Sequence, residues 1–331
     1  MVNPNALILT ARVENWPIAG SFVISRGAKT EARVVVAELA GGGVTGRGEC
    51  VPYARYGESP EAVVARIESL RDAIAVGMTR TELQTALPPG AARNALDCAF
   101  WDFEAKSSDR RAYELANLPA PKPVVTAFTI SIGSPDAMAK AANAAGARPL
   151  LKVKLGQAGD PERIAAVRAA APHAELIVDA NEGWNPDSLA ENLAACARAG
   201  VTLVEQPLPD GADDVLSGLQ RPLLLCADES AHDRKSLAAL VGKYDAVNIK
   251  LDKTGGLTEA LAMAHEAKRL GFSIMAGCMV ATSLSMAPAL LIAQMAMVTD
   301  LDGPLLLARD RPDGLRYDGS LVYPPDHTLW G

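Results

Sequence analysis

The sequence has no run of lysine and arginine, and no apolar stretch long enough to cross a membrane without a charge or a break. Its formal charge of −7 is spread along 331 residues, so we expect neither nucleic acid nor a membrane surface as a partner. The N-terminal MVNPNALILTARVENW lacks the basic segment and apolar core of a secretion signal. These absences predict a cytoplasmic protein.

Cysteine is scarce and shows no pairing pattern. The cysteines are odd in number, widely separated and without the CxxC spacing of a zinc site or redox pair: Cys50, Cys98, Cys196, Cys226 and Cys278. We interpret them as small core residues in a reducing compartment, with Cys278 and the neighbouring Met279 as passive parts of a pocket wall.

The N-terminal third has the pattern of a small α+β module. Residues 1 to about 48 alternate apolar and polar side chains around a glycine-bearing loop, which predicts antiparallel strands. From Ser59-Pro60 onward the spacing becomes helical, with serine as the N-cap and proline in the first turn. We therefore predict a module over residues 1–120.

After the proline-rich LPAPKPVV, short apolar strands alternate with alanine-rich helices, which predicts parallel strands with right-handed crossovers. Eight strands at this spacing favour a closed α/β barrel over residues 121–303. Residues 304–331 show no clear eighth helix, and we expect them to return to the N-terminal module. The expected strands are 124–133, 150–156, 176–181, 202–208, 223–230, 246–251, 273–278 and 297–303.

Charged residues end five consecutive strands, each one strand-helix unit after the last: Lys154, Asp179, Glu205, Asp228 and Lys250. In a parallel barrel, catalytic groups lie at the carboxyl ends of the strands. Each residue alone could be an ordinary ion pair at the rim of the barrel. Five in register predict a catalytic constellation.

The three carboxylates, Asp179, Glu205 and Asp228, predict a magnesium site. Oxygen ligands from separate rigid strands suit a hard divalent cation, whereas zinc would favour histidine or cysteine. Without a cation, the three carboxylates would repel one another and raise their pKa values.

The flanking lysines predict proton transfer. Lys154 and Lys250 belong to strands on opposite sides of the barrel, so their amines would approach opposite faces of a carbon next to a metal-bound carboxylate. A nearby cation disfavours their charged forms and so favours a role as bases. Lys152 points to the same side as Lys154, as Asp252 would with Lys250. Lys152 is thus available to bind the substrate carboxylate.

The motifs KVKLG, VDAN, VEQPLP, CADES and NIKLDKTGGL resemble the muconate-lactonising-enzyme subgroup of the enolase superfamily, over essentially the whole chain. The resemblance implies a modified (β/α)7β barrel, an N-terminal capping domain, Mg²⁺ and a lysine acid/base. TGG after Lys253 is a weak phosphate-binding signal and favours a turn. His232 follows CADES but has no placed partner, so we expect a structural role.

Asp300-Leu301-Asp302, at the end of the eighth strand, looks like the Asp-x-Asp motif of dipeptide epimerases, whose carboxylates hold a free α-ammonium group. WPIAGSFVISRGAKTEARVVVAEL, PYARYGES and GAARNALDCAFWD are similar to the L-Ala-D/L-Glu epimerases. This similarity implies that Lys29, where an arginine is common, and the nearby Arg26 meet a glutamate side chain. Lysine offers a point charge in place of a bidentate fork, which weakens the preference for glutamate.

We therefore predict Mg²⁺-dependent interconversion of L-Ala-L-Glu and L-Ala-D-Glu by a 1,1-proton transfer through an enediolate, in the setting of cell-wall (murein) peptide recycling that the resemblance implies. One alternative is N-acyl-amino-acid racemisation or o-succinylbenzoate synthesis by the same superfamily. Others are a Schiff-base or pyridoxal-phosphate barrel that uses one lysine, and a non-catalytic metal-binding barrel. The sequence leaves open whether the chain forms a homo-oligomer.

Overall fold

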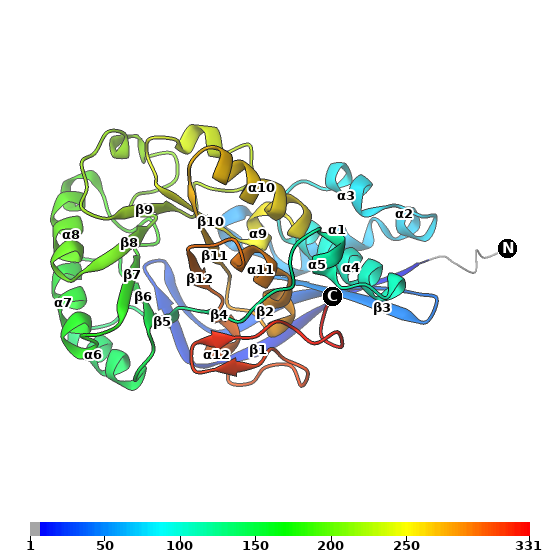
Figure 1. The fold of residues 1–331 in the computed structure, drawn as a ribbon, viewed down its shortest axis with the longest axis horizontal. Helices are drawn as coiled ribbons and strands as arrows, with labels where there is room; N and C mark the ends of the chain where they lie inside the picture. Colours follow the sequence, from blue (N-terminus) through cyan, green and yellow to red (C-terminus); the bar gives the residue numbers. More distant parts are fainter. Residues whose placement is uncertain (1–6) are drawn as a thin grey trace.

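The computed structural model describes residues 7–331. It begins with an antiparallel sheet in the order β1-β2-β3, from β1 (Ile8–Ile24), β2 (Gly27–Gly41) and β3 (Val44–Cys50). The long β1–β2 hairpin runs from this sheet toward β5 and β6 of the barrel (Figure 1). Its reach allows residues of the hairpin tip to meet groups at the barrel mouth.

Helices follow this sheet, as predicted from Ser59-Pro60. The Ser59 side chain accepts a hydrogen bond from Ala62 N, and Pro60 is the first helical residue, which suits its fixed φ and missing N–H. The elements are η1 (Ala54–Tyr56), α1 (Pro60–Glu68), α2 (Arg71–Ala75), α3 (Arg80–Ala86), α4 (Ala91–Ser108) and α5 (Ala112–Leu115). A Cβ on Gly48 of β3 would lie 2.1 Å from Ala95 O of α4, so glycine permits this close packing.

Eight parallel strands form the barrel and neighbour one another in chain order, which confirms the predicted α/β barrel. They are β5 (Phe128–Ile130), β6 (Leu150–Lys154), β7 (Glu175–Asp179), β8 (Val201–Glu205), β9 (Leu224–Ala227), β10 (Ala246–Ile249), β11 (Ser273–Gly277) and β12 (Val298–Asp300). No strand pairing joins β12 to β5 among the described residues. Instead Ala127 N donates to Thr299 O at 2.8 Å, so the barrel is nearly closed.

Helices cover the outside of the barrel, with two exceptions that correct the prediction. The connections after β8 and β9 contain only the 3-10 turns η2 (Asp214–Leu216) and η3 (Leu237–Leu240). Gly211 and Gly218 adopt positive φ within the first of these connections, which interrupts a regular helix there. The helices of the barrel are α6 (Pro135–Ala144), α7 (Asp160–Ala170), α8 (Pro186–Arg198), α9 (Leu251–Thr254), α10 (Leu257–Arg269), α11 (Ser283–Ala293) and α12 (Gly303–Leu306).

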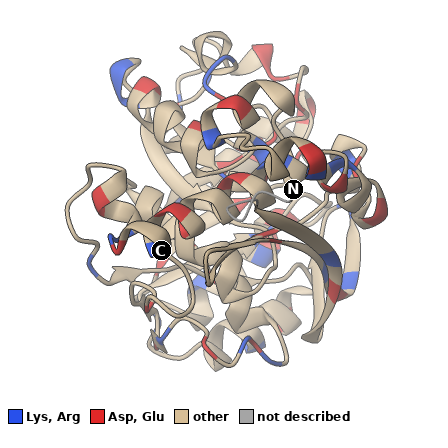
Figure 2. Ribbon diagram, turned by 90° about the vertical axis from the view of Figure 1, so that its right-hand side faces the viewer, with Lys and Arg blue, Asp and Glu red and all other residues tan. Residues whose placement is uncertain are grey.

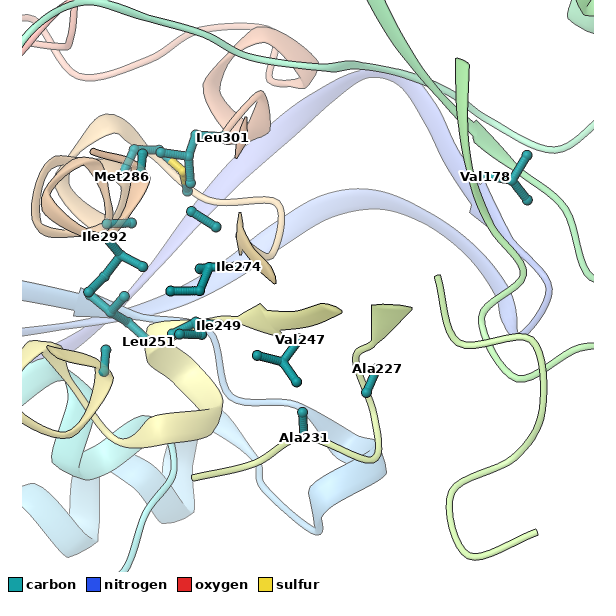
Figure 3. Packing of buried hydrophobic residues seen from close by; sticks show 14 of the residues in the cluster. Val178, Ala227, Ala231, Val247, Ile249, Leu251, Ile274, Met286, Ile292 and Leu301 are labelled. Carbon is teal, nitrogen blue, oxygen red and sulfur yellow. The ribbon is translucent and has the colours of Figure 1, made fainter. Parts of the chain in front are cut away.

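Two apolar layers hold the barrel together. Among the outward-facing strand residues, Ile274 of β11 lies on the side of Ile292 of α11, and Val247 of β10 lies beside Ala231 (Figure 3). Inside, one residue from or beside each strand contributes to a separate apolar plug: Ala127, Leu150, Ile177, Leu203, Cys226, Ala246, Met275 and Val298. The plug closes the barrel beneath its carboxyl end.

A third sheet, in the order β13-β14-β4, joins the C-terminal segment to the chain that enters the barrel. It consists of β4 (Val124–Val125), β13 (Tyr317–Asp318) and β14 (Leu321–Val322). The prediction of one strand over 124–133 is therefore wrong: β4 joins this sheet, β5 joins the barrel, and Thr126 and Ala127 turn between them. Beyond the sheet, Trp330 Nε1 donates to Cys98 O of α4 at 3.0 Å.

Charges of both signs are interspersed over the face shown in Figure 2, without a broad area of one sign. Within residues 7–331, no helix combines the length and the apolar composition that a membrane span requires.

Candidate active site

Strand alternation builds the site directly above the apolar plug. Residues two positions after the plug residues share their inward face, and most of them are polar or charged. This inward layer comprises Thr129, Lys152, Asp179, Glu205, Asp228, Asn248, Gly277 and Asp300. A Cβ on Gly277 would lie 2.3 Å from Asn248 Oδ1, so the glycine leaves room for the Asn248 amide.

The predicted carboxylate triad lies together in this layer. One ligand oxygen from each of Asp179, Glu205 and Asp228 lies within 4.8 Å of the others, and all three side chains are buried. Burial and the neighbouring Asp179 raise the pKa of Glu205 to about 8. Glu205 Oε2 lies 2.6 Å from the Lys152 ammonium without accepting a well-directed hydrogen bond. Three carboxylates that offer only oxygen ligands, one of them with an oxygen that accepts no hydrogen bond from the described residues, fit a hard divalent cation.

Lys152 is the central cation of the inward layer. Its Nζ lies 2.6 Å from Glu205 Oε2, 2.7 Å from Asp300 Oδ2 and 3.2 Å from Asp179 Oδ2. Burial opposes its charge, but the carboxylates of Asp300, Glu205 and Asp179 raise the pKa of Lys152 well above its ordinary value. The side chain also lines the cavity. Lys152 is thus positively charged and available to an anionic group of a ligand.

Lys154 and Lys250 meet the triad from its two ends. Lys154 Nζ lies 2.7 Å from Asp179 Oδ2, and Lys250 Nζ lies 2.6 Å from Asp228 Oδ2. Both line the cavity. Burial opposes the Lys250 charge, but Asp228 and Glu205 raise its pKa well above the ordinary value. The expected opposite effect of a bound cation stays a prediction.

Two partners of the triad escaped the sequence prediction. Lys253 Nζ lies 2.6 Å from Asp228 Oδ1, and Asn248 Nδ2 donates to Glu205 Oε1 at 2.6 Å. Asn248 could have been found, because it precedes Lys250 by two residues in an apolar strand. Lys253 could not be found by strand alternation, since it belongs to the one-turn helix α9, directly before the TGG considered as a phosphate-binding signal.

The predicted aspartate pair lies at the same mouth. Asp300 Oδ2 binds Lys152, whereas Asp300 Oδ1 is buried without a hydrogen-bond partner. Asp302 Oδ2 accepts a hydrogen bond from Thr129 N at 2.7 Å. Burial and the neighbouring Asp300 raise the pKa of Asp302 to about 7. Both aspartates line the cavity, so a ligand cation can reach them.

Arg26, at the tip of the β1–β2 hairpin, connects that hairpin to the barrel. Its guanidinium donates to Asn181 O at 2.9 Å and Glu182 Oε2 at 3.1 Å, and to Glu229 Oε1 at 2.7 Å and Tyr53 OH at 3.0 Å. These partners belong to the loops after β7, β9 and β3. Arg26 therefore holds the hairpin over the barrel mouth.

Lys29 has different surroundings. Its Nζ lies over the Tyr53 ring, 5.2 Å from the ring centroid, and it forms no salt bridge within the described part of the chain. Burial and the nearby Arg26 lower the pKa of Lys29. Lys29 and Arg26 both line the cavity. Lys29 is consequently the cation of this loop that is available to a ligand carboxylate.

These groups surround one cavity of about 830 Å³ between the N-terminal module and the barrel. Barrel side chains form its floor, and Arg26, Lys29, Tyr53 and Tyr56 form its cover. Cys278 and Met279 line the wall. The site therefore combines a carboxylate triad, two separated lysines, an aspartate pair and a cationic cover around a space for a small ligand.

The expected common orientation of Lys250 and Asp252 is wrong. The chain leaves strand β10 at Ile249, and Asp252 lies in α9. Its Oδ1 accepts hydrogen bonds from Val51 N at 2.9 Å and Asn94 Nδ2 at 2.8 Å. Asp252 thus binds the N-terminal module, and burial raises its pKa to about 7.

This raised pKa predicts a pH-dependent stability. Between the ordinary pKa of 3.8 and about 7, folded Asp252 retains a proton that the unfolded chain releases, so its contribution to stability is lost as pH rises through this window. Asp252→Asn keeps the oxygen that accepts both bonds. In urea titrations of metal-free protein, its free energy of unfolding should exceed the wild-type value by on the order of 2–4 kcal/mol at pH 8.

At pH 4 this difference should nearly vanish. Asp318→Asn, at an exposed position, serves as the matched control. A difference between wild type and Asp252→Asn that does not change with pH would contradict the assigned protonation.

Two family models match the chain. Residues 7–116 match the mandelate racemase / muconate lactonizing enzyme N-terminal domain, and residues 136–328 match the enolase C-terminal domain-like family. The chain is 50% identical to an L-Ala-D/L-Glu epimerase of Escherichia coli K12, over 92% of this chain and 95% of that protein. It is 46% identical to an N-acetyl-D-glutamate racemase of Pseudoalteromonas sp., over 86% of this chain and 91% of that protein.

Solved structures show the same architecture. An enolase family member from Agrobacterium tumefaciens with homology to dipeptide epimerases, solved with sodium, L-Ala-L-Glu and an ordered loop, is 56% identical with a TM-score of 0.97. The match covers 98% of this chain and 100% of the A. tumefaciens chain. A dipeptide epimerase from Enterococcus faecalis, complexed with Mg and L-Leu-L-Tyr, is 26% identical with a TM-score of 0.90, over 97% and 98% of the two chains.

Proposed function

The chain belongs to the mandelate racemase / muconate lactonizing enzyme family of the enolase superfamily, and we propose that within it the protein is a dipeptide epimerase that interconverts L-Ala-L-Glu and L-Ala-D-Glu. The observation that carries this function is one cavity that combines the triad, a lysine at each end of it and the Asp300/Asp302 pair. A Schiff-base enzyme would need one lysine and would leave the triad without a task.

The proposed cofactor is Mg²⁺, held by Asp179, Glu205 and Asp228. The E. faecalis relative was solved with Mg, and the all-oxygen donor set here fits the same ion. When bound, Mg²⁺ would stabilise the negative charge that develops on the substrate carboxylate as the α-proton leaves. This help is needed, because each pKa unit of mismatch between the carbon acid and its base costs about 1.4 kcal/mol.

Lys154 and Lys250 supply the proposed proton transfer. One amine removes the α-proton from one face, which leaves an enediolate, and the opposite ammonium returns a proton to the other face. Their roles exchange with the direction of the reaction. Lys152, which is charged and buried, would bind the substrate carboxylate and add positive charge where the enediolate forms.

The two ends of the dipeptide meet opposite charges in this assignment. Asp300 and Asp302 would bind the free α-ammonium, which would place a cation beside Asp302 and beside Asp300 Oδ1, the oxygen that Lys152 does not contact. Lys29 would bind the glutamate side-chain carboxylate, with Arg26 beside it. Because Arg26 already donates to four protein acceptors, we assign the carboxylate contact chiefly to Lys29 and the placing of the hairpin chiefly to Arg26.

The second candidate is racemisation of an N-acylated amino acid, which the 46% identical N-acetyl-D-glutamate racemase favours. Such a substrate has no free ammonium group. Within residues 7–331, Asp302 accepts a hydrogen bond only from the neutral backbone N–H of Thr129. An acylated substrate would therefore bring it no cationic partner. The amine end of the substrate therefore separates the two functions.

Loss of either lysine should stop epimerisation but leave the remaining lysine able to exchange the α-proton of one epimer. In Lys154→Ala and Lys250→Ala, we expect turnover to fall below detection, while D₂O exchange of the α-proton persists for a single epimer that differs between the variants. NMR of L-Ala-L-Glu and L-Ala-D-Glu measures both quantities, and retained Mg²⁺-dependent thermal stabilisation controls for folding. Wild-type epimerisation by either variant would show that a two-base mechanism is wrong.

Removal of both aspartate charges should act on the free amine. Asp300→Asn combined with Asp302→Asn should lose on the order of 2–5 kcal/mol of transition-state stabilisation for L-Ala-L-Glu. The N-acetylated dipeptide should gain relative to the free one, measured as the ratio of their kcat/KM values. If wild-type protein epimerises free and N-acetylated Ala-Glu equally well, the dipeptide assignment is refuted and the N-acyl racemase is favoured.

A further inference from the structure

The short segment between the two aspartates lacks the support of the barrel strands. Strand pairing of β12 with β11 ends at Asp300, which faces Gly277. Asp302 already begins the one-turn helix α12 as its N-cap residue. Only Leu301 separates the two carboxylates. Its two flanking peptide groups, together with the bonds from Thr129 N to Asp302 and from Lys152 to Asp300, set how the carboxylates are oriented relative to each other.

Both of these peptide groups are held by side-chain hydroxyl groups. Leu301 N donates to Thr126 Oγ1 at 2.8 Å, which fixes the peptide group after Asp300. Tyr317 OH donates to Leu301 O at 2.7 Å, which fixes the peptide group before Asp302. The Leu301 side chain is fully buried near Met286 (Figure 3), so the segment is anchored on three sides.

The two hydroxyl groups come from one structure outside the barrel. Tyr317 begins β13, and Thr126 directly follows β4 in the same three-stranded sheet. Their strands are joined through β14, where Val322 faces both Tyr317 and Val124. The C-terminal segment and the entrance to the barrel therefore hold the aspartate pair together.

Neither hydroxyl group touches the reacting atoms of the site. Thr126 is fully buried, and neither it nor Tyr317 belongs to the cavity wall. Burial raises the pKa of Tyr317 well above its ordinary value, so its hydroxyl remains a donor. The aspartates they support are exposed to the cavity, and Asp300 Oδ1 has no protein partner there.

We propose that Tyr317 and Thr126 are positioning residues that set the geometry of Asp300 and Asp302 for the substrate amine. The proposal rests on the proposed dipeptide function. Without the two hydroxyl groups, the Leu301 peptide groups can rotate, and the two carboxylates no longer converge on one ammonium group. The glutamate side chain, which would meet Lys29 of the hairpin, does not depend on this segment. Lys152, 2.7 Å from Asp300 Oδ2, would contact both the substrate carboxylate and this aspartate.

The test compares Tyr317→Phe and Thr126→Val with wild type. Each removes one hydroxyl and retains the shape of the side chain. The KM for L-Ala-L-Glu should rise roughly three- to tenfold in each variant, the effect of one lost hydrogen bond, with a smaller change in kcat. The D₂O exchange rate of N-acetyl-Ala-Glu should fall less than that of the free dipeptide, so the preference for the free amine falls.

Two further variants separate positioning from general stability. Thr126→Ser keeps the acceptor oxygen and should restore the wild-type preference for the free amine. Tyr323→Phe changes another tyrosine of the C-terminal segment, whose ring centroid lies 3.3 Å from the guanidinium carbon of Arg316. This variant should leave the preference for the free amine unchanged. If Tyr317→Phe fails to fold, Thr126→Val and its control Thr126→Ser still give the comparison. If Thr126→Val fails to fold, Tyr317→Phe and its control Tyr323→Phe give it.

The outcomes are distinct. If wild type prefers the free amine and both Tyr317→Phe and Thr126→Val keep that preference in full, the positioning role is overturned while the dipeptide function stands. An equal loss of rate on free and N-acetylated substrates also overturns it, because a structural effect alone then explains the variants. If wild type shows no preference, the proposed function fails, and the positioning role fails with it.

Discussion

Four carboxylates share one buried layer of the barrel with the Lys152 ammonium, and that shared burial is the constraint on which the site depends. Asp179, Glu205, Asp228 and Asp300 lie two residues above an apolar plug that excludes water from below. Buried charges are stable only when paired, and removal of one partner typically costs about 3–5 kcal/mol. The lysines around the layer therefore stabilise the same carboxylates with which they would act on a substrate.

The cover of the cavity follows from this buried layer. An open mouth would let water screen the charges and compete for the substrate carboxylate. The β1–β2 hairpin reaches across from the N-terminal module, and Arg26 attaches its tip to three loops of the protein. Asp252 adds a second connection, at the base of the module. The N-terminal sheet and the barrel sheet thereby enclose one site.

Much of the site could be predicted because strand alternation is a local property. Lys154, Asp179, Glu205 and Asp228 each end or follow a short apolar strand, so their spacing alone placed them at one mouth of the barrel. Asp252 was misjudged and Lys253 was missed because a one-turn helix begins directly after Lys250, and four residues give no periodic signal. The division of 124–133 into β4 and β5 depends on pairing with β14, nearly two hundred residues away in the sequence. The Arg26 contacts likewise depend on tertiary structure.

The central claim is that one cavity binds the dipeptide by both ends and exposes its second α-carbon to two lysines. A crystal structure of the protein with Mg²⁺ and L-Ala-L-Glu tests it most directly. The expected result has the ion on Asp179, Glu205 and Asp228, the ammonium group between Asp300 and Asp302, and the Nζ atoms of Lys154 and Lys250 on opposite faces of the glutamate α-carbon. Both lysines on one face, or an ammonium group distant from both aspartates, would contradict the mechanism.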